Sequence, residues 1–146
     1  VDLFCQAITD LELKGIVVGD GDEKKKLEKQ YPNIEFVGWK NKDEVKQYMR
    51  GARALIFPSR WYEGAPLTPL EAMQYGIPCL VSSVSSAIEY IKNKEEIFDL
   101  TKKDLENKII IYNKKIEKYS YIAYNYIKKE KNKNYIKDLK KMFDKV

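Results

Sequence analysis

Short apolar runs alternate along the chain with segments in which apolar residues recur every three to four positions. The runs are rich in β-branched and aromatic residues and predict strands, whereas the helical spacing predicts amphipathic helices. The expected strands cover 14–19, 33–38, 52–58, 77–83 and 96–98, and the expected helices cover 2–11, 22–30, 42–51, 69–75, 86–92, a stretch from 101 and one or two more from about 119. This alternation predicts an α/β fold, a Rossmann-like parallel sheet with helices on both faces and extra C-terminal helices.

Ligands of parallel sheets bind beyond the carboxyl ends of the strands. In this chain the loops expected at that edge are 19–22, 38–41, 58–68 and 82–86. Capping-box spacing at Asn41 and Glu44, and again at Ser86 and Glu89, supports helices that open directly after two of these loops.

The helix after the third expected strand has clear start and stop signals. Thr68 stands where an N-cap residue belongs, Pro69 at the first helical position and Glu71 at the third. Gly76 suits the left-handed residue that follows a helix, and Pro78 blocks continuation. The N-terminus of this helix is therefore expected at the ligand edge, where it favours anions such as phosphate.

Composition narrows the chemistry that this chain can perform. Its 146 residues, 44% of them hydrophobic, suffice for one domain with a hydrophobic core. The absence of histidine excludes Ser-His-Asp and Cys-His catalysis and histidine-ligated metal sites within the chain. Cys5 and Cys79 are too few for a disulfide framework or a structural zinc site, so we expect buried thiols in a reducing compartment. No run approaches the roughly 20 apolar residues of a membrane span, and the first ten residues do not resemble a signal peptide.

Charge divides the chain into two parts. The formal net charge is +5, but residues 1–100 sum to −3 and residues 101–146 to +8. A basic segment rich in Lys, Ile, Asn and Tyr could bind a membrane surface or nucleic acid. It could equally form a helix with one solvated basic face and an opposite face packed on the domain, and we favour this second interpretation. We expect one domain over 1–146, an α/β core at 1–100 followed by basic helices at 101–146. The last helix is expected to be partly exposed or loosely packed at Tyr135, Ile136 and Leu139.

The segment EGAPLTPLEAMQYGIP, residues 63–78, resembles the Glu-x7-Glu motif of retaining GT-B glycosyltransferases of the glycosyl transferases group 1 family. Three upstream segments, IVVGDGDEKKKLE, NIEFVGWKNKDEVKQYM and ARALIFPSRWYEG, resemble the family's strand–GxG–helix, V-x-F-x-G and A-D-x4-P-S-x-x-E-G segments in the same order. Each motif is weak alone, and the set is specific. The resemblance covers residues 1–92 closely and the tail loosely.

The resemblance implies the C-terminal half of a GT-B fold, a single nucleotide-sugar-binding domain that serves as the donor half of a retaining hexosyltransferase. Glu63 matches the family's catalytic-site acid, which lies against the donor sugar, and Glu71 matches the acid that hydrogen-bonds the ribose. The donor-binding residues so implied are Glu71, Gly64, Ala65, Pro66, Leu67, Thr68, Gly19, Gly21, Gly38, Trp39 and Lys40. A UDP-sugar is the expected donor, and no cofactor, metal or nucleic acid is expected.

Two departures from the family pattern affect this assignment. Pro66 replaces a glycine and lacks an N–H, so one donor to phosphate or sugar is lost. Ser85 and Ser86 stand where the family often has glycines, which leaves their role open. The family's pyrophosphate-clamping Arg and Lys and its acceptor-binding N-terminal domain would precede Val1, so we expect the isolated chain to be inactive. Family analogy implies a cytoplasmic setting, peripheral on the inner membrane face.

The residues by themselves leave alternatives open. Glu71 could act only as a helix-capping acid, Glu63 as a solvated carboxylate and Trp39 as a packing residue. Trp61 and Tyr62 fit a sugar-stacking shelf or an interface with the acceptor-binding domain, and Arg60 fits a surface position. At the level of function, the alternatives are a non-catalytic nucleotide-sugar-binding module, a GT-B-fold sugar-nucleotide epimerase, and a basic interaction domain.

Overall fold

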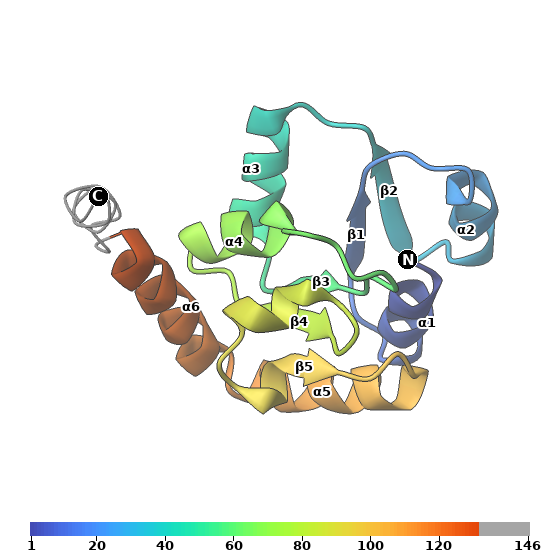
Figure 1. Cartoon of the computed structure of the whole chain (residues 1–146). Helices are drawn as coiled ribbons and strands as arrows, with labels where there is room; N and C mark the ends of the chain where they lie inside the picture. Colours follow the sequence, from blue (N-terminus) through green and yellow to red (C-terminus); the bar gives the residue numbers. More distant parts are fainter. Residues whose placement is uncertain (132–146) are drawn as a thin grey trace, which may run out of the picture.

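The computed structural model of the chain describes residues 1–131, and its helices and strands alternate as the sequence predicts (Figure 1). In chain order the elements are α1 (Asp2–Asp10), β1 (Gly15–Val18), α2 (Lys24–Gln30), β2 (Ile34–Gly38), α3 (Lys42–Gly51), β3 (Leu55–Phe57), α4 (Leu67–Gln74), β4 (Cys79–Ser82), the 3-10 turns η1 (Ser86–Tyr90) and η2 (Lys94–Glu96), β5 (Ile97–Phe98), α5 (Lys102–Lys114) and α6 (Ile116–Lys131). The expected properties of Tyr135, Ile136 and Leu139 lie outside the described residues.

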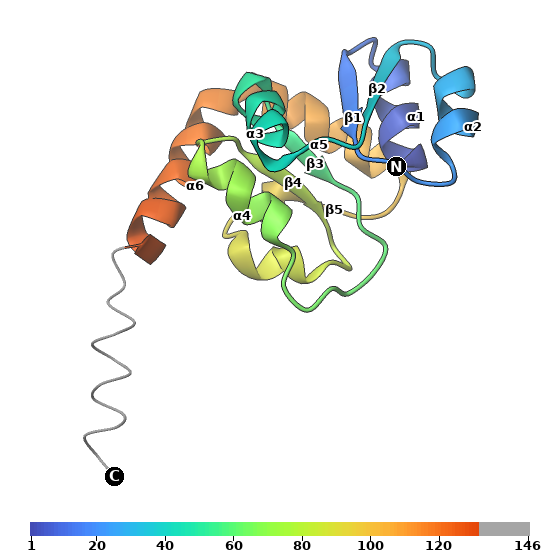
Figure 2. The same ribbon diagram turned by 90° about the horizontal axis from the view of Figure 1, so that it is seen from above.

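The strands form two parallel sheets. β1 pairs with β2, with Gly15 opposite Ile34, and the second sheet has the order β3-β4-β5, with Leu55 opposite Cys79. Figures 1 and 2 show β1 on the side of β2 that faces the second sheet. The parallel α/β fold is thus confirmed, and in the described part of the chain its strands are divided between two sheets.

Helices cover the two sheets unequally. α1 lies so close to β1 that a Cβ on Gly15 would come within 3.0 Å of Ile8 and Phe4 side-chain atoms, so a larger residue there would have to displace these side chains. On the opposite face of β1, Ile16 and Val18 are 47% and 37% exposed. The prediction of a strand covered on both faces is therefore wrong for β1, because among residues 1–131 only one of its faces meets a helix.

The core divides into two clusters. Helices α1 and α5 pack against each other and enclose one cluster, which includes Cys5 and Tyr112. Helices α4 and α6 pack around the other, which includes Cys79. Both cysteines are free and buried, as expected from the composition. No helix in residues 1–131 is long and apolar enough to cross a bilayer.

Some of the helix ends predicted from local sequence signals agree with the structure, and others do not. Asn41 caps α3 in a full capping box with Glu44, as predicted. The predicted start of α4 is wrong, because the helix begins at Leu67 with Pro66 as N-cap and no side-chain cap. Proline is tolerated anywhere in the first turn, where its missing N–H has no helical partner, so Pro69 does not fix the start. The predicted cap Ser86 is also wrong, because η1 is capped by Ser85, whose side-chain hydroxyl accepts a hydrogen bond from the Ala87 N–H.

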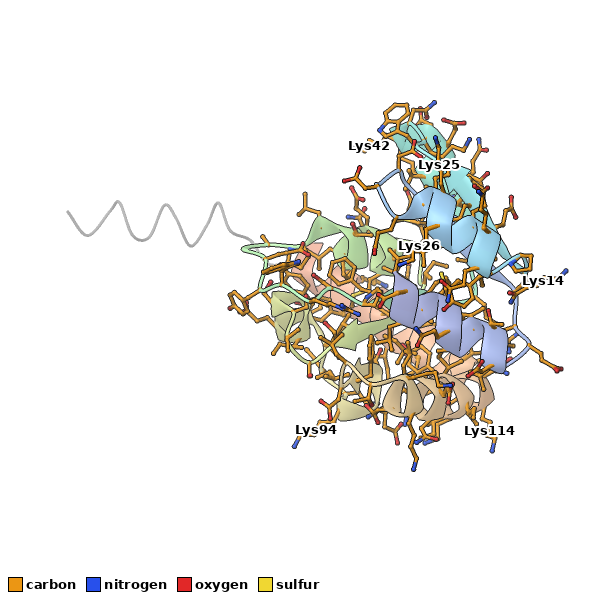
Figure 3. All side chains as sticks on the ribbon, turned by 90° about the vertical axis from the view of Figure 1, so that its right-hand side faces the viewer. Lys14, Lys25, Lys26, Lys42, Lys94 and Lys114 are labelled. Carbon is orange, nitrogen blue, oxygen red and sulfur yellow. The ribbon has the colours of Figure 1, made fainter. Side chains whose placement is uncertain are left out.

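The lysines labelled in Figure 3 come from several elements. Lys25 and Lys26 lie on α2, Lys42 on α3, Lys94 on η2 and Lys114 on α5, whereas Lys14 precedes β1.

Candidate functional site

The loop that follows β3 is fixed to the carboxyl end of β4. Buried Ser82 donates its hydroxyl hydrogen bond to the carbonyl of Ser59, and buried Ser86 donates to the carbonyl of Glu63. On the exposed side, the Tyr62 hydroxyl donates to Glu89 Oε1 at 3.1 Å. This loop is therefore held at both its start and its middle, as a positioned binding loop requires.

Glu63 lies at the exposed tip of this loop. Ser59 Oγ donates to Glu63 Oε1 at 2.7 Å, so the carboxylate is oriented while it stays accessible. Within the described residues, the backbone N–H groups of Gly64 and Ala65 donate to no protein acceptor. Nothing lies within 4 Å of a Cβ built on Gly64, so a ligand can approach this backbone closely.

Glu71 lies inside α4, one turn from its start. Helix α4 has no side-chain N-cap, and in the part of the chain that the structure describes the Glu71 carboxylate has no hydrogen-bond or ion-pair partner. The alternative of Glu71 as a capping acid is therefore wrong. Its carboxylate is available to bind a ligand.

Glu71 and Lys40 line the same cavity, which lies between α3 and α4 and has a volume of about 370 Å³. The full lining is Lys40, Lys42, Val45, Lys46, Met49, Glu71, Gln74 and Tyr75. Two of the three lysines have acidic neighbours on α3: Lys40 Nζ lies 3.8 Å from Glu44 and Lys46 Nζ lies 2.7 Å from Asp43. The cavity thus combines one unpaired carboxylate with several cations, a combination suited to a ligand carrying both hydroxyls and negative charge.

The loops after β1 and β2 are joined by Asp20. The Gly19 N–H donates to the Gly38 carbonyl at 2.8 Å, and the Asp20 carboxylate accepts from Lys24 Nζ at 3.0 Å and from the Trp39 N–H at 2.9 Å. These hydrogen bonds, led by the one from Lys24, lower the pKa of Asp20. Gly19 and Gly38 have φ values of +130° and +72°, so both turns depend on glycine.

The aromatic side chains at this edge face outward. Trp39 is 72% exposed and Trp61 78% exposed, so most of each residue is uncovered by the described residues. Tyr62 and Leu67 are also largely exposed. Arg60 lies on the surface as expected and pairs with Asp2 at 2.7 Å.

The structure thus brings Gly19 together with Gly38 and Lys40 together with Glu71, and it places Glu63 to Thr68 on the adjoining loop and first turn of α4. Gly21 remains in the exposed loop after β1. The sequence analysis missed Asp20, Ser59, Ser82 and Ser86 as residues that hold these loops. The one available signal was the run SSVSS after a buried strand, because serines buried there need backbone carbonyls to accept their hydrogen bonds.

Comparison with known proteins gives the class of the protein. The family model of the glycosyl transferases group 1 matches residues 1–141, and the chain belongs to this family. It is 29% identical over 99 residues to a UDP-Gal:alpha-D-GlcNAc-diphosphoundecaprenol alpha-1,3-galactosyltransferase of Escherichia coli; the match covers 63% of this chain and 25% of that protein. The chain spans about a quarter of the length of the curated relatives it matches.

Solved structures agree on the fold. The catalytic domain of cholesterol-alpha-glucosyltransferase from Helicobacter pylori has a TM-score of 0.78 at 18% identity, covering 90% of this chain and 88% of that one. Anabaena HepE in complex with UDP-glucose has a TM-score of 0.73 at 19% identity, covering 86% of this chain and 38% of that one. The expected GT-B type of fold is thereby confirmed.

Proposed function

We propose that this chain is the donor-binding domain of a retaining glycosyltransferase that transfers a hexose from a UDP-sugar to a glycan or lipid-linked acceptor. Family membership supports glycosyl transfer, and the Escherichia coli relative is named for a UDP-galactose donor and a diphosphoundecaprenol-linked acceptor. The structural neighbour HepE was solved with UDP-glucose bound.

The observation that carries the proposal is the unpaired carboxylate of Glu71 in the cavity that it shares with Lys40. A carboxylate can accept hydrogen bonds from two neighbouring hydroxyls, as a ribose presents them. Lysine side chains and the N-terminus of α4 favour the negative charge of a diphosphate. In this proposal Glu71 binds the ribose, and Gly19, Gly38 and Lys40 lie around the nucleoside.

The sugar is proposed to lie against the fixed loop after β3. Glu63 is oriented by Ser59 and remains exposed, and the free N–H groups of Gly64 and Ala65 are available to the sugar and phosphate oxygens. Glu63 is the proposed catalytic residue. Pro66 and Thr68 shape the backbone around the donor, although Pro66 contributes no hydrogen bond.

We infer that a second, acceptor-binding domain covers this edge in the complete enzyme. The exposed side chains of Trp61, Tyr62 and Leu67 are gathered on one loop and the adjoining helix start, which is unusual unless a partner surface or ligand covers them. The acceptor named for the Escherichia coli relative is lipid-linked, which supports action at a membrane surface.

Calorimetry with UDP tests the proposed roles of the two acids. A hydrogen bond to a charged group contributes roughly 1.5–3 kcal/mol, so Glu71→Gln should weaken UDP binding roughly ten- to a hundredfold. Glu63→Gln should leave UDP binding nearly unchanged, because Glu63 is proposed to touch only the sugar. In the complete enzyme Glu63→Gln should lower the transfer rate.

Glu28→Gln is the matched control, since it removes one negative charge from an exposed position on α2, away from the cavity. It should bind UDP like the wild type. Wild-type affinity in Glu71→Gln would overturn the ribose assignment, and a loss of UDP binding in Glu63→Gln would overturn the assignment of Glu63 to the sugar.

A further inference from the structure

Trp39 and Lys40, two of the proposed donor-binding residues, lie between the end of β2 at Gly38 and the start of α3 at Lys42. Neither strand pairing nor a helix therefore fixes their backbone. The Trp39 side chain is largely exposed, so it anchors the segment little. Lys40 can keep one direction only if hydrogen bonds hold the residues around it.

Two hydrogen bonds hold this segment. At its far end, the Asn41 N–H donates to Glu44 Oε2 at 2.9 Å in the capping box of α3. At its near end, the Trp39 N–H donates to Asp20 Oδ2 at 2.9 Å. Lys40 thus lies between two residues whose backbone N–H groups are held by carboxylates.

The Asp20 carboxylate is itself fixed in place. Its Oδ1 accepts from Lys24 Nζ at 3.0 Å, and the Gly19 N–H donates to the Gly38 carbonyl at 2.8 Å. A Cβ built on Gly38 would lie 2.9 Å from Lys24 Nζ and 3.6 Å from both carboxylate oxygens of Asp20. The ion pair therefore lies directly over Gly38, and a larger residue at that position would disturb it.

Lys40 depends on this arrangement more than the other two lysines of the cavity do. Lys42 and Lys46 belong to α3, so the helix directs their side chains. The Lys40 side chain is 25% exposed, and its Nζ lies 3.8 Å from Glu44 Oε1, in the cavity that Glu71 also lines. The direction of Lys40 is therefore set by the backbone of the loop and by Glu44.

A surface ion pair would be the ordinary role of Asp20. Its side chain is 58% exposed and lies four residues before Lys24, and exposed pairs at this spacing stabilise a protein only slightly. The hydrogen bond to Trp39 is of a different kind, because it crosses 19 positions of the chain and joins two loops of the ligand edge. A hydrogen bond from a backbone N–H to a charged acceptor is also among the stronger ones in proteins.

We propose that Asp20 is a positioning residue of the donor site: by holding the Trp39 N–H, it keeps Lys40 directed into the cavity that contains Glu71. Asp20 itself touches no ligand in this arrangement and acts through Lys40. The ligand is the nucleoside diphosphate of the proposed function, on which this inference rests.

NMR order parameters of the backbone amides, measured without ligand, test the positioning directly. In the wild type we expect values near 0.85 at Trp39 and Lys40, about those of rigid backbone, and in Asp20→Ala values below about 0.6. The Gly19 amide is the internal reference, because its bond to Gly38 involves no atom of the Asp20 side chain. Unchanged values at Trp39 and Lys40, or an equal loss at Gly19, would overturn the inference.

Calorimetry with UDP tests whether Asp20 acts through Lys40. Ordering of one long side chain changes affinity by roughly two- to tenfold, so Asp20→Ala should weaken UDP binding by that factor. In a Lys40→Ala background the same substitution should cause no further loss, because the side chain that Asp20 positions is already gone. A general structural effect would weaken binding by the same factor in both backgrounds, and that result would overturn the inference.

Two matched controls separate this role from charge and from the ion pair. Asp22→Ala removes an exposed acid of the same loop that has no hydrogen bond or ion pair among residues 1–131, and Lys24→Gln removes the ion pair while Asp20 keeps Trp39 as its partner. Both should bind UDP like the wild type, and a loss in either equal to that of Asp20→Ala would contradict the assigned role. Absence of UDP binding in the wild type would overturn the proposed function, while the order parameters still decide whether Asp20 holds the loop.

Discussion

At the scale of single residues, Glu96 is an acid buried inside the protein. Its side chain is 3% exposed, and the Tyr112 hydroxyl donates to its Oε1 at 2.9 Å. Burial raises the pKa of Glu96 to about 7, and the hydrogen bond from Tyr112 opposes this only in part. The folded protein therefore holds a proton on Glu96 at pH values where the unfolded chain has released it.

This difference makes stability depend on pH in a defined direction. Between about pH 4.5 and pH 7 the native state binds the extra proton, so the contribution of Glu96 to the free energy of unfolding falls as pH rises and is constant above that range. Glu96→Gln should remove this loss, so that from pH 4.5 to pH 8 the variant gains about 3 kcal/mol relative to the wild type. Urea unfolding of both proteins at the two pH values measures the change.

Glu95→Gln is the control, because the stability contribution of Glu95 changes with pH in the opposite direction. Hydrogen bonds from the Tyr119 hydroxyl and from Lys115 lower the pKa of Glu95, so its stabilisation is present above its unfolded pKa and is lost as pH falls through the folded value. The substitution should therefore cost stability near pH 7 and little in acid. An equal pH response of the two variants would contradict the assignment of the raised pKa to Glu96.

The residues of the site show what a sequence can and cannot predict at this scale. Glu63 and Glu71 can be proposed as site residues from the sequence, because a fixed spacing in one segment carries the resemblance. Asp20, Ser82 and Ser86 bind partners that lie 19 to 23 positions away in the chain, so the sequence does not identify those partners, even where the run SSVSS marks the two serines. The role of Ser86, left open by the sequence, is to hold the carbonyl of Glu63.

At the scale of elements, the end of α4 depends on one glycine. Gly76 has a φ of +70° directly after the helix, as the sequence predicts. Its added Cβ would meet its nearest neighbours at 3.8 Å, so the cost of Gly76→Ala is backbone strain and not a clash. Left-handed backbone costs an L-residue about 1–2 kcal/mol. We expect a loss of that size in the free energy of unfolding.

Gly51→Ala is the control for this prediction. Gly51 ends α3 without a positive φ, and nothing lies within 4 Å of its added Cβ. Alanine there reduces the conformational freedom of the unfolded chain, so the variant should be unchanged or slightly more stable. Equal destabilisation of the two variants in denaturant titrations would contradict the explanation from backbone strain.

Some element ends could be predicted from neighbouring residues, such as the start of α3 and the end of α4, whereas the surroundings of an element could not. The capping box of α3 involves residues three apart, so its signal is complete in the sequence. The exposure of Ile16 and Val18 on β1 depends on which strands and helices lie beside it, and an apolar run alone reads as buried. The pattern predicted all five strands and their positions along the chain, whereas it did not predict their division into two sheets.

At the scale of the whole molecule, charge is distributed unevenly along the chain. Residues 1–100 sum to −3 and the remainder to +8, so the excess of basic residues lies in the last third. Among the described residues, exposed aromatic side chains lie on the loops after β2 and β3, at Trp39, Trp61 and Tyr62, and also on α6, at Tyr121 and Tyr124. The loops that the proposed function uses lie within residues 1–100, outside the basic segment.

The last prediction concerns what the chain of residues 1–146 does alone. It contains the proposed donor site, so it should bind UDP. Glycosyl transfer also requires the donor and the acceptor to be held together in the orientation for reaction, and a site that encloses both provides this. We therefore expect no transfer from UDP-galactose or UDP-glucose to a lipid-linked glycan acceptor, measured with a radiolabelled sugar, even when UDP binding is detectable in the same sample. Turnover by the isolated chain would show that the acceptor site lies within it. The exposed Trp61 and Tyr62 would then be the first residues to examine as an acceptor surface, because their side chains are uncovered beside the loop that holds Glu63.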